Sequence, residues 1–261
     1  AIKWLYFVII FLCAVAGGVP PFAWPGIARR SAGFPKGEAF TSGVFLALAL
    51  MMMLPSAFTV FRQALPGVEF PVASITAVVA FLALLAIEHM TTRLVDDSLP
   101  AKGELRTPAI IPVILTAMIA LPSFFLGAAL GISDGIAALL IFIAVILHKG
   151  TAAFALALTM VRSTLTRSQG IFLLICFALM TPLGILAGGL AGEYMSGNAL
   201  LIKAIVLSLG AGTLLYMGTL HELKRTPLIE HCGKLSCFLW MLAGLLITAM
   251  VRWIIGEAHS F

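Results

Sequence analysis

The stretch Ile141–Val161, IFIAVILHKGTAAFALALTMV, decides the fold class of this chain. It is long and apolar enough to cross a bilayer, which takes about 20 residues of helix, yet His148 and Lys149 interrupt it near the middle. Ionisable groups at that depth are costly, so we expect them to face a polar partner or a water-filled transport path. The alternative is that both side chains only hydrogen-bond neighbouring helices as structural contacts.

The composition extends this interpretation to the whole chain. Of 261 residues, 61% are hydrophobic and 10% are charged, whereas a soluble domain has about 25% charged residues. We therefore predict an all-α polytopic membrane protein, with the lipid bilayer as its partner. Most of the basic residues behind the net charge of +5 lie in short connectors without interleaved aromatic residues. We therefore expect no nucleic-acid partner.

Eight apolar segments are long enough to span a membrane, and we predict one transmembrane domain over residues 1–261. The predicted helices cover about 2–22, 39–61, 70–90, 109–131, 136–160, 170–191, 199–220 and 235–256. An even number of spans places both termini on one side, and Lys and Arg gather in the connectors of the other side. The positive-inside rule then predicts both termini outside and the long loop 91–107 in the cytoplasm. We expect the membrane to be the plasma (inner) membrane.

Polar residues and prolines interrupt three further spans near their centres. A proline in a membrane helix frees a backbone carbonyl, which a neighbour, a water or an ion in a cavity must satisfy. The interruptions are Met52, Pro55 and Ser56 in the second span, Pro122 and Ser123 in the fourth, and Met180, Thr181 and Pro182 in the sixth. The spacings Gly127/Gly131 and Gly184/Gly188 predict close helix packing around these positions.

Six segments, in order, resemble the ZIP (Zrt-, Irt-like) family of divalent metal transporters. They are GVFLALALMMMLPSAF (43–58), IEHM (87–90), LPSFFLGAALG (121–131), HKGTAAFALAL (148–158), ALMTPLGILAG (178–188) and AGTLLYMGTLHEL (211–223). The resemblance implies an eight-helix bundle of ZIP type, outside termini, a metal ion as substrate and a homodimer. It implies no cofactor, because zinc or another divalent metal is the cargo.

The resemblance also identifies candidate site residues, although many usual ligands are replaced. Pro122 and Leu126 stand where the family has a His and an acid, and Ala152 stands where an acid often follows the His of the fifth helix. One subfamily with His-Lys-Gly lacks that acid too. His148 and Ser123 remain as metal ligands. The implied transport path also contains Lys149, whose charge stands in for a second cation, together with Met52, Ser56, Pro122, Leu126, Ala152, Met180 and Thr181.

A second polar cluster lies at the predicted cytoplasmic end. It comprises His221, Glu222, His231, Cys232, Glu88 and His89. These residue types suit zinc or another transition metal, so an exit site is one interpretation. The alternative is that they are ordinary solvated groups at a membrane boundary.

We therefore expect transport of divalent transition-metal cations, of the zinc or iron class, toward the cytoplasm. As the resemblance implies, helices one, four, five and six rock against the remainder. The alternative is a degenerate ZIP-fold protein that has lost the binuclear metal site and moves a non-metal solute or regulates other transporters. We expect no enzyme, because His221-Glu222 begins an HExxH-like pattern whose second His is replaced by Arg225.

Overall fold

The computed structural model describes residues 2–28, 35–97, 108–194, 198–221 and 235–257. Within these residues all regular elements are helical, and eight helices are long and apolar enough to cross a membrane. Those spans are Ile2–Ala23, Lys36–Ala64, Val72–Met90, Ile110–Ile132, Gly135–Arg162, Arg167–Gly192, Ala199–Thr219 and Ser236–Ile254. The predicted all-α bundle of eight membrane helices is confirmed.

Two of the described spans are built from more than one helical element, namely Lys36–Ala64 and Ala199–Thr219. The chain runs through α1 (Ile2–Ala23), α2 (Pro25–Ala28), α3 (Pro35–Leu48), η1 (Ala49–Met53), α4 (Leu54–Ala64), α5 (Val72–Asp97), α6 (Ile110–Ile132), α7 (Gly135–Arg162), α8 (Arg167–Tyr194), α9 (Ala199–Tyr216), η2 (Met217–His221) and α11 (Ser236–Glu257). Because no Gly or Pro interrupts α5, it continues to Asp97. Residues 91–97 of the expected loop 91–107 are therefore helical, which corrects the loop boundary.

The second span contains a π-helical turn just before Pro55. Pro55 has no backbone N–H, and its ring conflicts with the carbonyl four residues earlier; the wider turn of η1 lies at that place. The three methionines all lie in η1 and point in different directions, since successive helical residues are rotated by roughly 100°. Met51 is 40% exposed, whereas Met52 and Met53 are buried.

Helices α6 and α8 touch through their backbones. A Cβ atom added at Gly127 or Gly131 of α6, or at Gly184 or Gly188 of α8, would overlap a backbone carbonyl of the other helix. The carbonyls concerned belong to Thr181, Ile185, Phe124 and Ala128 respectively. The close packing predicted from the glycine spacing is confirmed, because only residues without a side chain allow this approach.

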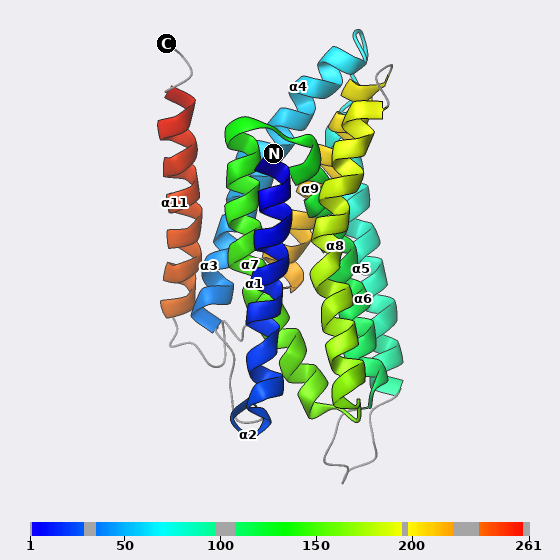
Figure 1. Cartoon of the computed structure of the whole chain (residues 1–261). Coiled ribbons are helices and arrows are strands. Elements are labelled where there is room, and N and C mark those ends of the chain that lie inside the picture. The colour runs from blue at the N-terminus through cyan, green and yellow to red at the C-terminus, as the bar shows by residue number, and fades with distance from the viewer. Residues whose placement is uncertain (1, 29–34, 98–107, 195–197, 222–234, 258–261) are drawn as a thin grey trace.

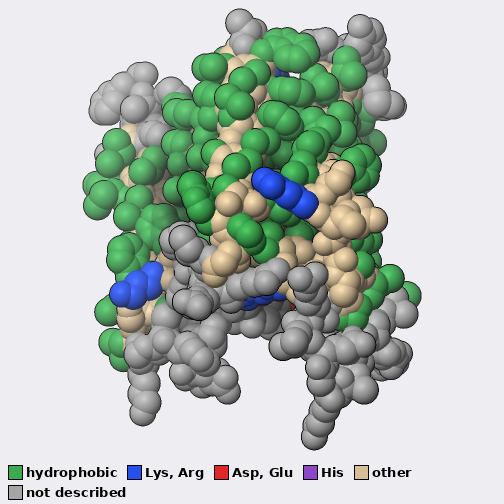
Figure 2. Space-filling model, turned by 60° about the horizontal axis from the view of Figure 1, so that its bottom comes forward, with side chains coloured by type: hydrophobic (Ala, Val, Ile, Leu, Met, Phe, Trp, Pro, Cys, Tyr) green, Lys and Arg blue, Asp and Glu red, His purple; other side chains and the backbone are tan. Residues whose placement is uncertain are grey.

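The start of α1 and the end of α11 lie at the same end of the bundle, which we call the termini end (Figure 1). The turn between α4 and α5 lies at this end as well. Hydrophobic side chains cover most of the described surface seen in Figure 2, as expected of a protein that faces lipid.

An ion pair ties α1 to the junction of α6 and α7 at the termini end. Lys3 Nζ lies 3.1 Å from Asp134 Oδ1 and donates a hydrogen bond of 2.7 Å to the carbonyl of Gly131. Gly131 is in the last turn of α6, where a cation complements the negative end of the helix dipole. These contacts hold α1 beside the span that carries Ser123.

Candidate metal path at His148

The two polar residues of α7 lie between two hydrophobic clusters. His148 is 4% exposed and Lys149 is 1% exposed. On the side of the termini end, α7 contributes Ile141, Ala144 and Val145 to one cluster. On the other side it contributes Ala152, Ala153, Leu156, Ala157 and Met160 to the second. The imidazole and the amine are thus buried between two apolar clusters.

Lys149 has a definite polar partner in α8. Its Nζ donates a hydrogen bond of 2.9 Å to the carbonyl of Phe177 and lies 3.7 Å from the centroid of the Phe177 ring. The first contact satisfies a donor of the buried amine, and the second places the amine over an aromatic face, the geometry of a cation–π interaction. In this conformation Lys149 therefore serves as a structural contact between α7 and α8, the alternative left open by the sequence.

His148 contacts α3 on the other side of α7. Its ring meets Phe45 edge-on, with the ring centroids 4.8 Å apart and the planes at 61°, an arrangement that aromatic quadrupoles favour. Phe45 is completely buried. The small exposure of His148 means that the expected hydrated passage beside it is closed in this conformation, with Phe45 packed against the ring.

The other residues of the expected path lie inside the bundle. Ser123, Pro122, Leu126, Met52, Ala152 and Thr181 are buried, while Ser56 and Met180 are half-buried. Leu126 and Met52 belong to the same hydrophobic cluster, and Ala152 belongs to the other. Among the described residues, no group of three or more His, Cys, Asp or Glu side chains could hold a metal ion.

A cavity of about 330 Å³ lies between α4, α7 and α9 and reaches the α6–α7 junction at the termini end. Met52 and Ser56 line it, as do three residues that the sequence interpretation missed, namely Ser133, Asp134 and Lys203. The cavity also touches Ile141, about two turns of α7 from His148. The polar connector Ser133–Asp134 was visible in the sequence, but its place beside Met52 depends on how the helices pack.

The expected exit cluster is only partly described. Glu88 Oε2 accepts a hydrogen bond of 2.8 Å from the hydroxyl of Tyr216, a contact that the sequence did not indicate, and His89 is exposed. Cys237, close to this cluster in sequence, is disulfide-bonded and so is not a thiolate ligand. The side chain of His221 and the whole of Glu222, His231 and Cys232 lie outside the described residues.

Comparison with known proteins agrees with the architecture. Residues 102–252, more than half of the chain, match the family model described as ZIP Zinc transporter. Human zinc transporter ZIP1 is 27% identical over 84% of this chain and 78% of its own length. Zinc transporter ZIP1 from Bos taurus is 26% identical over 86% of this chain and 80% of its own length. Human zinc transporter ZIP2 is 31% identical over 48% of this chain and 40% of its own length. The chain therefore belongs to the ZIP zinc transporter family, a family of membrane transporters and not of enzymes.

Proposed function

We propose that this chain carries divalent transition-metal cations, of the zinc or iron class, across the membrane toward the cytoplasm. Family membership and the eight-helix bundle support transport. The observation that supports the location of the path is His148, an imidazole buried at mid-span between two hydrophobic clusters. Imidazole nitrogen is a good ligand for zinc and for iron.

The metal path starts at the cavity of the termini end in this proposal. Asp134 supplies an exposed carboxylate there, and Met52 and Ser56 lead inward. His148 and Ser123 then offer one nitrogen and one oxygen ligand. Zinc prefers about four ligands, so water must complete the coordination, and the ion is held only briefly during transfer.

The path opens when Phe45 leaves His148. Phe45 is on α3, whereas His148 is on α7, and the rocking motion implied by the family resemblance moves α1, α6, α7 and α8 relative to α3. Such a motion separates the two rings and exposes the imidazole. Lys149 stays with α8 through the carbonyl of Phe177, so its charge moves together with His148.

Most of the usual family ligands are replaced in this chain, and we infer that the binuclear metal site is reduced to one ion. Leu126 and Ala152 are buried apolar residues at positions where the family resemblance places acids. Lys149 lies one residue from His148, and its protonated form takes the place of a second cation.

Further parts of the proposal concern the surroundings of the path. The exit cluster comprises Glu88, His89, His221, Glu222, His231 and Cys232. Both termini face outward from the plasma (inner) membrane, which the distribution of Lys and Arg supports. Homodimerisation follows from the family resemblance alone.

Uptake into vesicles tests the proposal directly. Purified wild type, His148→Ala and Thr159→Ala are reconstituted, and entry of zinc, iron, manganese and cadmium is measured. Thr159 is a half-buried α7 residue whose hydroxyl, among the described residues, hydrogen-bonds only the carbonyl of Leu156. Its substitution is therefore a matched loss of a polar group on the same helix. We expect His148→Ala to reduce uptake at least about tenfold, the lower range for damage to a metal site, and Thr159→Ala to leave it intact.

Equal uptake by the two variants would remove His148 from the path. Absence of uptake of all four metals by the wild type would favour the second candidate, a ZIP-fold protein that moves a non-metal solute or regulates other transporters. The lack of a three-ligand group among the described residues favours that candidate. In that case Pro122→His combined with Leu126→Glu should restore zinc binding, measured by calorimetry.

A further inference from the structure

A second cavity, of about 440 Å³, lies at the turn between α4 and α5. Its wall is a type II turn, with a hydrogen bond of 3.3 Å from Val68 N to Leu65 O. Pro66 occupies the second position of this turn and Gly67 the third, with φ of 86°, which is the combination that a type II turn requires. The turn therefore gives the cavity a defined backbone shape.

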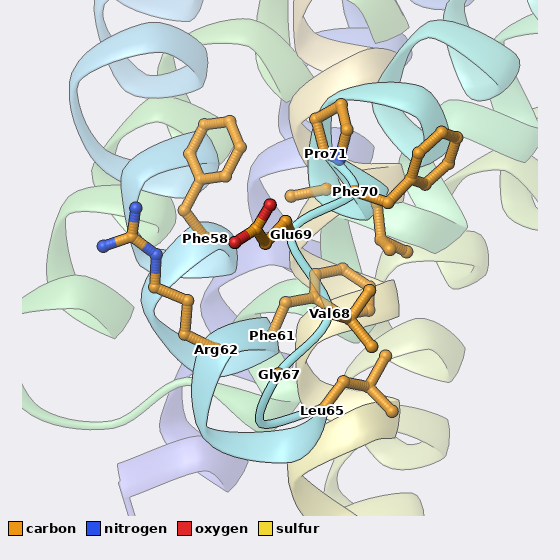
Figure 3. A pocket seen from close by; sticks show the side chains of 11 residues that line it. Phe58, Phe61, Arg62, Leu65, Gly67, Val68, Glu69, Phe70 and Pro71 are labelled. Carbon is orange, nitrogen blue, oxygen red and sulfur yellow. The ribbon is translucent and has the colours of Figure 1, made fainter.

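Two opposite charges reach into this cavity from its two sides. Arg62 comes from the last turn of α4 and Glu69 from the segment before α5, and Figure 3 shows both side chains directed toward the same space. Within the described part of the chain, neither makes an ion pair or a hydrogen bond. Both charges are thus available to a ligand that carries one positive and one negative group.

Aromatic rings complete the lining. Phe58 lies beside the two charged groups (Figure 3) and is 36% exposed, while Phe61 is buried. An aromatic face attracts a cation such as an alkylammonium group. The guanidinium of Arg62 suits a phosphate, to which it can donate two parallel hydrogen bonds.

We propose that this cavity binds the headgroup of a zwitterionic phospholipid of the phosphatidylethanolamine class. Arg62 holds the phosphate, and Glu69 with Phe58 holds the ammonium group. An anionic lipid lacks the ammonium and meets repulsion from Glu69. A metal ion is disfavoured because a single carboxylate faces it beside a guanidinium.

The location identifies the ligand as a lipid and not a soluble zwitterion. The cavity lies where one membrane span ends at Ala64 and the next begins at Val72, so it is at the level of the headgroups. Val68 and Phe70, in the cavity lining, are 49% and 64% exposed. Exposed apolar side chains at that level mark a surface that contacts the membrane, where a bound lipid covers them and a free amino acid does not.

Native mass spectrometry of the detergent-purified full chain tests this proposal. Phosphatidylethanolamine and phosphatidylglycerol are added separately, and the lipid-bound fraction is measured for wild type, Arg62→Gln and Glu69→Gln. Arg252→Gln is the matched control, because Arg252 is an exposed arginine on α11 outside this cavity. Thermal unfolding of each variant shows whether it is folded.

We expect the wild type to retain phosphatidylethanolamine roughly two- to fivefold more than phosphatidylglycerol, the size of an exposed charge contact. Arg62→Gln should reduce retention of both lipids, while Glu69→Gln should abolish the preference between them. Equal retention of the two lipids by the wild type overturns the proposal. Glu69 would then not distinguish a headgroup with an ammonium from one without it, as when Arg62 and Glu69 neutralise each other. An Arg252→Gln effect as large as that of Arg62→Gln also overturns it, because only net charge would matter.

Discussion

Two adjacent glycines of α8 should respond in opposite directions to the same substitution. A Cβ atom at Gly188 would lie closer than 3.0 Å to the backbone of Ala128 on α6, whereas one at Gly189 would lie 4.0 Å from the carbonyl oxygen of Gly131. Ordinary van der Waals contact of a Cβ begins at 3.4 Å. Gly188→Ala must therefore push the two helices apart, but Gly189→Ala fits without any movement.

The size of the difference follows from two terms. Replacing a glycine by alanine inside a helix stabilises the folded state by roughly 0.5–1 kcal/mol, and this gain is common to both variants. Overpacking at a tight contact costs about 1–3 kcal/mol, and the backbone of Ala128 cannot rotate away as a side chain could. The free energies of unfolding should thus differ by about 1–3 kcal/mol between the variants, with Gly188→Ala below wild type and Gly189→Ala equal to or above it.

Thermal unfolding of the purified chain in detergent measures this difference. A thiol-reactive fluorophore reports unfolding through Cys13 and Cys176, which are free and half-buried. We expect the unfolding temperatures to differ by about 2–4 °C for each kcal/mol. If the two variants unfold at the same temperature, the backbone contact between α6 and α8 is not as close as described and the reasoning is refuted.

Three further predictions concern single contacts and topology. Lys149→Ala should lower the free energy of unfolding by at least about 1 kcal/mol more than Lys149→Met, since methionine fills the buried volume of the lysine stem and alanine leaves a cavity; chemical unfolding measures both, and equal losses would count against a packed stem. Tyr216→Phe should cost about 1 kcal/mol by the same measurement, because it removes a hydrogen bond to the carboxylate of Glu88, whereas Tyr6→Phe, in a ring stacked on Phe142, should cost less. In a cysteine-free background, Gln63→Cys should react with a membrane-impermeant thiol reagent added from outside and Ser168→Cys should not; the reverse labelling would invert the proposed topology.

The spans could be predicted from the sequence because, inside a bilayer, each segment must satisfy its backbone hydrogen bonds within itself. A run of about 20 apolar residues satisfies its own backbone hydrogen bonds as a helix, whatever its neighbours are. The turn Pro66–Gly67 is equally local, since proline sets one backbone angle and glycine alone accepts the positive φ. The end of α5 was missed because the helix continues beyond the membrane boundary to Asp97, where no glycine or proline stops it.

What the sequence by itself determined, therefore, is the membrane class, the eight spans and the need of His148 and Lys149 for partners. Only the tertiary structure decided which partners they have. Lys149 meets a backbone carbonyl of Phe177 and His148 meets the ring of Phe45, and neither contact has a signature in residue type or spacing. Such pairings depend on how far each helix is rotated and how closely the backbones approach, as at Gly127 and Gly188, and these are properties of the packed bundle and not of any one span.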